Sequence, residues 1–190
     1  GRGWRWKHPV HEMLCNDKPN CIVSKTKIRV CQDRSTTELK KFKSRLPWDL
    51  AVLNAEHLEK NQCTRTMFYL AQTLSALGKK KEALEMYMKR CASSEGDSWE
   101  KYRAMIRCGD TYAFFSKVNE AIDWYLRAVS ESERLGTFNP TGLIHAGRIC
   151  RQIGRPKLAY MYLRYAAQFD VDDNSPYHVD TNLMYFTKWN

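Results

Sequence analysis

An internal repeat of 38 residues is the feature of this sequence that most restricts its fold. Ala83, Ala121 and Ala159 follow one another at this spacing. A fixed period of roughly 20–50 residues is typical of repeat proteins, in which each unit packs against its neighbours. The spacing therefore predicts stacked units in the second two-thirds of the chain. Three further columns obey the same step: Ala71, Gly109 and Gly147; Gly78, Ser116 and Gly154; Tyr87, Tyr125 and Leu163.

The order of residue types within a unit indicates how that unit folds. A small residue is followed after seven positions by a glycine-like turn, after five more by alanine, and after another four by an aromatic or apolar residue. This order resembles the helix-turn-helix pattern of tetratricopeptide repeats, whose usual period is about 34 residues. Small residues let two helices pack closely, and glycine permits the turn between them. We therefore predict a mainly α fold: a tetratricopeptide-like helical-hairpin stack of three repeats with a short N-terminal β segment.

The chain is expected to divide into a head and a helical domain. Residues 1–46 form the head, in which partial alternation of apolar and polar residues between 21 and 33 predicts a strand. Residues 47–190 form the helical domain with a C-terminal extension. Its first helix is expected near 47–60, with Pro47 in the first turn, where proline is favoured. The predicted helix pairs are 64–77 with 80–92, 97–115 with 117–135, and 139–153 with 155–169.

Composition restricts the classes of partner. Thirty-one lysines and arginines against 21 aspartates and glutamates give a net charge of +10. The basic residues are scattered, and no RNA-binding or recognition-helix pattern accompanies them, which argues against nucleic acid. No run of about 18 apolar residues exists, so no transmembrane segment is predicted.

The seven cysteines have no paired spacing. This distribution favours free thiols and a reducing compartment, which points to the cytoplasm. A zinc site could be assembled in the head, although its spacing matches no common zinc finger. The ligands available for it are His8, His11, Cys15, Cys21 and Cys31.

Six polar side chains are expected on the inner face of the stack when positions are counted from the small-residue column. Four of them are arginines and one is a carboxylate, so this face is predicted to be a basic groove. Arginine guanidinium groups could bind an anionic peptide, a phosphate or an acidic glycan. Alternatively, they could form ion pairs with acidic residues of neighbouring helices. The groove candidates are Arg65, Gln72, Arg103, Asp110, Arg148 and Arg151.

Part of the sequence resembles one particular use of this repeat, the helical tail of family-two glycosyltransferases. The most specific phrase is RTMFYLAQTLSALG in the first repeat. The segments that carry the resemblance are Arg65–Gly78, Glu82–Ala83, Tyr87–Arg90, the head residues Trp6, Val10, His11 and Glu12, and the aromatic tail Leu183–Trp189.

The resemblance implies that the chain contains the end of a GT-A nucleotide-sugar domain. The helices would pack on that catalytic domain, in cis or on a separate chain, and help to bind a sugar or peptide acceptor. His11 and Glu12 are the candidates for contacting a metal or the donor diphosphate. A divalent metal, Mg²⁺ or Mn²⁺, would be expected only with the catalytic domain.

No catalytic residue can be assigned from the sequence. Asp170-Val171-Asp172 has the form of a metal-binding Asp-x-Asp, but it follows a helical pattern, so we interpret it as a loop. The chain alone is therefore expected to be inactive in sugar transfer. The alternative interpretation is a free-standing tetratricopeptide adaptor that binds an extended anionic peptide in the basic groove.

Overall fold

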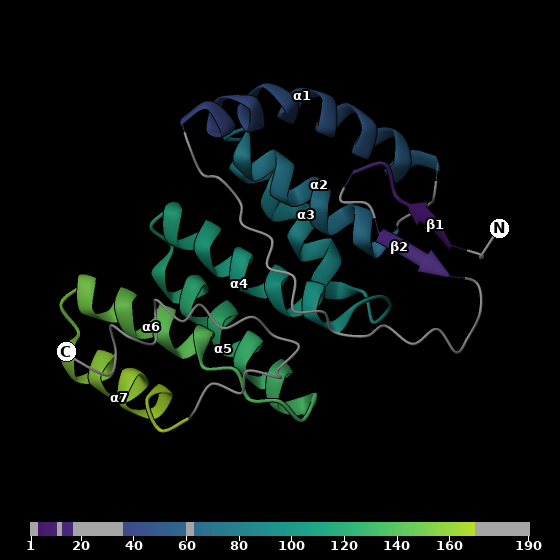
Figure 1. Cartoon of the computed structure of the whole chain (residues 1–190). Coiled ribbons are helices and arrows are strands. Elements are labelled where there is room, and N and C mark those ends of the chain that lie inside the picture. The colour runs from purple at the N-terminus through teal and green to yellow at the C-terminus, as the bar shows by residue number, and fades with distance from the viewer. Residues whose placement is uncertain (1–3, 11–12, 17–35, 60–62, 170–190) are drawn as a thin grey trace.

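The computed structural model describes residues 4–10, 13–16, 36–59 and 63–169 (Figure 1). This described part contains seven helices and a two-stranded antiparallel hairpin. None of these helices combines the length and apolarity needed to cross a membrane. The bounds, in chain order, are β1 Trp4–Lys7, β2 Met13–Asn16, α1 Thr36–Glu59, α2 Thr64–Ala76, α3 Lys80–Ala92, α4 Ser98–Phe114, α5 Val118–Arg134, α6 Thr141–Gln152 and α7 Pro156–Ala166.

Three helical hairpins, α2–α3, α4–α5 and α6–α7, form the body of the structure, which confirms the predicted stack (Figure 1). Each hairpin turns at the column that the repeat identified. Gly78 and Gly154 have φ values of 81° and 72°, and Ser116 has a φ of 58°. Glycine adopts this left-handed conformation readily, whereas Ser116 must carry the strain of its Cβ. The predicted turn column is therefore confirmed, including the position at which it departs from glycine.

The small-residue columns lie where the two helices of a hairpin approach each other. Ala83 and Ala121 are fully buried. A Cβ atom on Gly109 would collide with the ring of Tyr125, and a Cβ atom on Gly147 would lie 2.6 Å from Leu163 Cγ. Only a residue without a side chain therefore allows these two contacts between helices.

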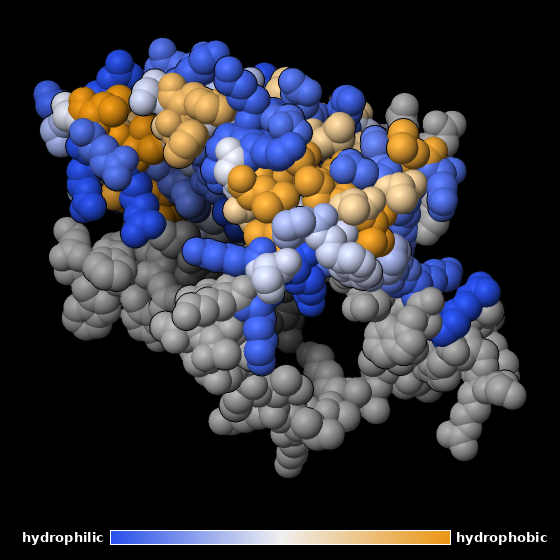
Figure 2. All heavy atoms as spheres, turned by 90° about the horizontal axis from the view of Figure 1, so that it is seen from above, coloured by the Kyte–Doolittle hydropathy of each residue, from blue (hydrophilic) through white to orange (hydrophobic). Residues whose placement is uncertain are grey.

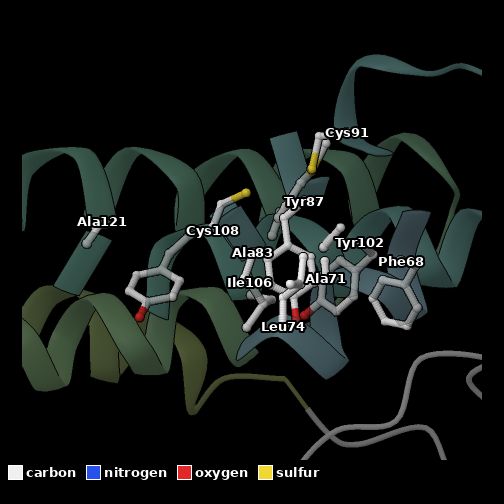
Figure 3. Close-up of a cluster of buried hydrophobic side chains, with 14 of the residues drawn as sticks. Phe68, Ala71, Leu74, Ala83, Tyr87, Cys91, Tyr102, Ile106, Cys108 and Ala121 are labelled. Carbon is white, nitrogen blue, oxygen red and sulfur yellow. The ribbon is translucent and has the colours of Figure 1, made fainter. Parts of the chain in front are cut away.

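Successive hairpins pack through α3 against α4 and through α5 against α6, while the first helices α2 and α4 also touch. The main core runs through all of these contacts. Phe68 and Tyr87 lie in it with ring centroids 6.3 Å apart, close to Tyr102 and Ile106 (Figure 3). Such aromatic pairs favour edge-to-face packing, and this pair has an interplanar angle of 61°. This pair therefore packs the two helices of the first hairpin together, and Tyr102 and Ile106 of α4 extend the same core to the second hairpin.

The helix predicted near 47–60 begins earlier than expected. Helix α1 starts at Thr36, so Pro47 lies inside it and not in its first turn. Leu46 and Leu53, seven residues apart, are both buried and anchor one stripe of the helix against the stack. This stripe continues across the proline, which costs the helix one backbone hydrogen bond without ending it. The expected boundary between residues 46 and 47 therefore falls within a continuous helix.

Near the N-terminus, strands β1 and β2 form an antiparallel pair in which Trp4 pairs with Asn16 and Lys7 pairs with Met13. The strand predicted between 21 and 33 lies outside the described residues. Val10, which follows β1, is buried in the main core.

His8, a candidate zinc ligand, is engaged elsewhere. Its Nδ1 atom lies 3.0 Å from Oε1 of the buried Glu56 on α1, so it fastens the β-hairpin to the stack. Among the described residues, no group of three or more His, Cys, Asp or Glu side chains could hold a metal ion. Of the other zinc candidates, Cys15 belongs to β2, and His11, Cys21 and Cys31 lie outside the described part.

Candidate functional site

The six predicted groove residues all lie on the first helices of the three hairpins. Arg65 and Gln72 belong to α2, Arg103 and Asp110 belong to α4, and Arg148 and Arg151 belong to α6. The structure nevertheless places them in different surroundings.

Arg65 is held by the stack itself. Its Nη1 atom donates a hydrogen bond to Glu100 Oε1 at 2.7 Å, and its guanidinium group lies 4.7 Å from the centroid of the Tyr69 ring. Glu100 is buried, and this burial raises the pKa of its carboxyl although the positive charge of Arg65 opposes the rise. The hydrogen bond to Glu100 therefore ties Arg65 of α2 to α4. This contact gives Arg65 a structural role in the packing of the two helices.

The negative charge of Asp110 is engaged by three neighbouring side chains. It accepts hydrogen bonds from Arg107 at 3.0 Å and from the Tyr125 hydroxyl at 2.9 Å. His145 Nδ1 lies 3.6 Å from the same carboxylate, and its ring stacks on Tyr125 at 5.1 Å. These contacts join α4, α5 and α6. Asp110 therefore adds little negative charge to the groove.

A pocket of about 410 Å³ opens where α1, α2, α3 and α4 meet. Two predicted groove residues, Gln72 and Arg103, lie in it. The face of the molecule that carries α1 is largely hydrophilic, with hydrophobic patches between the polar side chains (Figure 2). The residues that line the pocket and bear on its chemistry are Arg45 and Asp49 of α1, Gln72 and Thr73 of α2, Lys80 and Tyr87 of α3, and Arg103 and Arg107 of α4.

Two of the four cations that line the pocket are paired with carboxylates. Arg45 Nε lies 3.2 Å from Asp49 Oδ2, four residues further along α1. Arg107 Nη1 lies 3.0 Å from Asp110 Oδ2, three residues further along α4. These two cations therefore contribute little net charge to the pocket.

The other two cations, Lys80 and Arg103, form no ion pair within the described residues. Lys80 Nζ donates to the Ser75 hydroxyl at 2.8 Å and lies 5.8 Å from the centroid of the Phe114 ring. The Arg103 guanidinium lies 4.8 Å from the centroid of the Trp99 ring. Both cations have neutral neighbours that hold their charged groups in place.

The surroundings of Arg103 oppose its charge. Burial lowers the pKa of this guanidinium, and the positive charge of Arg107 lowers it further. Burial also raises the pKa of the Tyr87 phenol on the wall of the same pocket. The pocket thus contains a half-buried positive charge, a neutral phenol and the Gln72 amide, all of which can donate hydrogen bonds. This arrangement suits an anionic group that brings its own acceptor oxygens.

The remaining predicted residues lie apart from this pocket. Arg148 is half-buried and Arg151 is exposed, both on α6, whereas the pocket is lined by α1 to α4. His11 and Glu12 lie outside the described residues. Sequence reasoning missed Arg45, Lys80 and Arg107. Arg107 could have been found, because it lies one helical turn after Arg103 and shares its face.

Comparison with known proteins identifies the fold. No protein-family model and no curated protein matches the chain. Among solved structures, MamA has a TM-score of 0.56 at 14% identity, covering 72% of this chain and 75% of its own. A putative kinesin light chain of Podosopora anserina with tetratricopeptide-like repeats has a TM-score of 0.57 at 12% identity, covering 80% and 78%. The Yersinia enterocolitica chaperone SycD has a TM-score of 0.51 at 18% identity, covering 70% and 95%.

These comparisons overturn the interpretation as part of a family-two glycosyltransferase. The similar structures are tetratricopeptide proteins, and none of them points to a GT-A domain. The predicted transferase role, the nucleotide-sugar donor and the GT-A partner are therefore wrong. The expectation of Mg²⁺ or Mn²⁺ depended on that catalytic domain and loses its basis with it. What this chain shares with the similar structures is the fold, a tetratricopeptide-like stack of helical hairpins.

Proposed function

We propose that this chain is a protein-binding module that holds an extended acidic segment of a partner protein along its first helices. The observation that carries this proposal is the pocket between α1 and α4, where Lys80 and Arg103 have no carboxylate partner among the described residues. An acidic side chain of a partner would supply the missing negative charge. The Yersinia neighbour is a translocator chaperone, which agrees with a protein as the partner.

The positions of the donors favour an extended segment. Gln72 and Arg103 lie on the first helices of consecutive hairpins, and both side chains line the same pocket. An amide can bond to the main chain of a peptide, while a guanidinium fork binds a carboxylate in two places. Repeat proteins commonly use such a row of first helices as an extended binding surface.

Binding should therefore require negative charge on the peptide and positive charge at Arg103. We expect a fluorescent glutamate-rich peptide to bind, and a lysine-rich peptide of equal length not to bind, in fluorescence anisotropy. Arg103→Glu should weaken binding of the glutamate-rich peptide by about tenfold or more, because it places a like charge in the pocket. Raising the salt concentration should weaken binding to the wild-type protein as well.

Arg164→Glu is a matched control for this experiment. Arg164 lies on α7, is exposed, and its guanidinium stands 5.8 Å from the centroid of the Tyr160 ring, much as Arg103 stands over Trp99. The change of charge is the same, but α7 does not line the pocket. Equal losses in the two variants would mean that net charge alone attracts the peptide, and the proposed groove would be refuted.

A further inference from the structure

The two pocket cations without a carboxylate partner stand at opposite ends of helix α4. Arg103 lies beside Trp99 in the first turn of α4, and Lys80 lies beside Phe114, its last residue. Neither cation forms an ion pair within the described part of the chain. We infer that the pocket binds two acidic side chains of the partner segment, one at each cation, which lie six residues apart in the partner's sequence. This inference rests on the function proposed above.

Neutral groups hold each cation in its own place. Lys80 Nζ donates a hydrogen bond to the Ser75 hydroxyl at 2.8 Å and lies 5.8 Å from the centroid of the Phe114 ring. The Arg103 guanidinium lies 4.8 Å from the centroid of the Trp99 ring. Cations placed over an aromatic face in this way keep hydrogen-bond donors for an anion. Lys80 and Arg103 therefore offer two separate anchor points.

The distance between the anchor points follows from the geometry of α4. Trp99 and Phe114 are 15 residues apart on this single helix (Figure 1). An α-helix rises by 1.5 Å per residue, so their backbones are about 22 Å apart along its axis. Because each cation stays next to its ring, the two charges are on the order of 20 Å apart. One carboxylate cannot contact both, so two acidic side chains are needed.

The same distance sets the spacing of the two acidic side chains. A fully extended chain advances by about 3.4 Å per residue, so six residues span about 20 Å. Successive side chains of an extended chain point to opposite sides. Residues i and i+6 therefore point to the same side, and both can face the pocket wall. A spacing of two residues would cover only about 7 Å and leave one cation without an anion.

The other cations that line the pocket are already paired. Arg107 lies between Trp99 and Phe114 in the sequence of α4, and its Nη1 atom is 3.0 Å from Asp110 Oδ2. Arg45 on α1 is 3.2 Å from Asp49. The uncompensated positive charge of the described pocket wall is thus restricted to the two anchor points. The partner residues between the two acids need no charge of their own.

The test compares three peptides of equal length and composition, each rich in glycine and serine with two glutamates. The glutamates are two, six or ten residues apart, so the peptides carry the same net charge. Isothermal titration calorimetry on the full chain should show about tenfold tighter binding at the spacing of six, because only this peptide forms charge-assisted contacts at both anchor points. The glutamate-rich peptide proposed above serves as the positive control.

Variants locate the two contacts. Arg103→Gln and Lys80→Gln should each remove the preference for the spacing of six, since one anchor point is then missing. Arg164→Gln should retain it, because Arg164 lies on α7, which does not line the pocket. Circular dichroism shows whether each variant is folded. The comparison of the three peptides on the wild-type protein stands on its own if a variant fails to fold.

The other outcomes separate this inference from the proposed function. Binding of the glutamate-rich peptide without any preference among the three spacings would overturn the two anchor points and leave the proposed function intact. Tightest binding at a spacing of two or ten would overturn the inferred spacing in the same way. Absence of binding by all the peptides, the glutamate-rich one included, would overturn both.

Discussion

Tyr125→Ala is expected to lower the free energy of unfolding by about 3–5 kcal/mol, the usual cost of removing a large aromatic side chain from a core. Tyr125 is 2% exposed. Its ring lies against Gly109 of α4, where no side chain exists to fill the space that the ring would leave. The same ring stacks on His145 of α6. The substitution therefore damages the contacts of α5 with both neighbouring helices, and chemical denaturation followed by circular dichroism measures the loss.

Tyr125→Phe separates the ring from its hydroxyl. This variant loses only the hydrogen bond of 2.9 Å to Asp110, so it should cost about 1 kcal/mol. Asp110 keeps its contact with Arg107 in that variant. If Tyr125→Ala were no less stable than Tyr125→Phe, the ring would not occupy the column position that the 38-residue repeat assigns to it.

Arg90→Ala is expected to be comparably damaging, with a loss of about 3–5 kcal/mol, because it removes one member of a buried charged network. The Arg90 side chain is 0% exposed and donates from Nη2 to the backbone carbonyl of Asp97, in the loop before α4. Desolvation lowers the pKa of its guanidinium, and the nearby Glu100 opposes that shift. Without Arg90, the Asp97 carbonyl loses this donor and Glu100 loses one of its two neighbouring cations.

Arg134→Ala provides the control, since it removes the same side chain from a surface position. Arg134 is 64% exposed and pairs with Glu131, three residues earlier on α5. Exposed pairs of this kind usually contribute less than about 1 kcal/mol. Comparable urea midpoints for the two alanine variants would show that Arg90 does not stabilise the junction between α3 and α4.

The helices and turns could be predicted closely from the sequence. The small residues and the turn residues act locally, and they recur at a fixed period, so their positions can be recognised without a structure. Gly109 and Gly147 are recognisable without a structure, since they fall in the repeated small-residue column where the two helices of a hairpin approach closely. The start of α1 could not be predicted in the same way. Pro47 is a local signal for a helix start, but the burial of Leu46 and Leu53 against the stack outweighs it.

The mistaken resemblance to glycosyltransferases has a structural explanation. The phrase that carried it consists largely of residues that pack the first hairpin. Phe68 and Ala71 are fully buried in the core, Tyr69 lies under the Arg65 guanidinium, and Arg90 is buried beside the loop before α4. Such residues report how the helices pack, and the same packing serves proteins of unrelated function.

Two of the six predicted groove residues line the pocket that the structure shows. Counting from the small-residue columns led to Gln72 and Arg103, and both side chains line the pocket between α1 and α4. The same count could not reveal that Arg65 pairs with Glu100, because these partners lie 35 residues apart. Nor could it reveal Lys80, which reaches the pocket from the second helix of the hairpin. Contacts between distant residues decide which charges stay available to a ligand.

The central claim is that a partner segment binds in the pocket between α1 and α4. The most direct measurement is a titration of ¹⁵N-labelled protein with the glutamate-rich peptide, followed by two-dimensional NMR of the backbone amides. The largest shifts are predicted around Gln72, Lys80 and Arg103, with little change on α7. Shifts confined to α7, where Tyr160 and Met161 are exposed, or no shifts at all, would contradict the account.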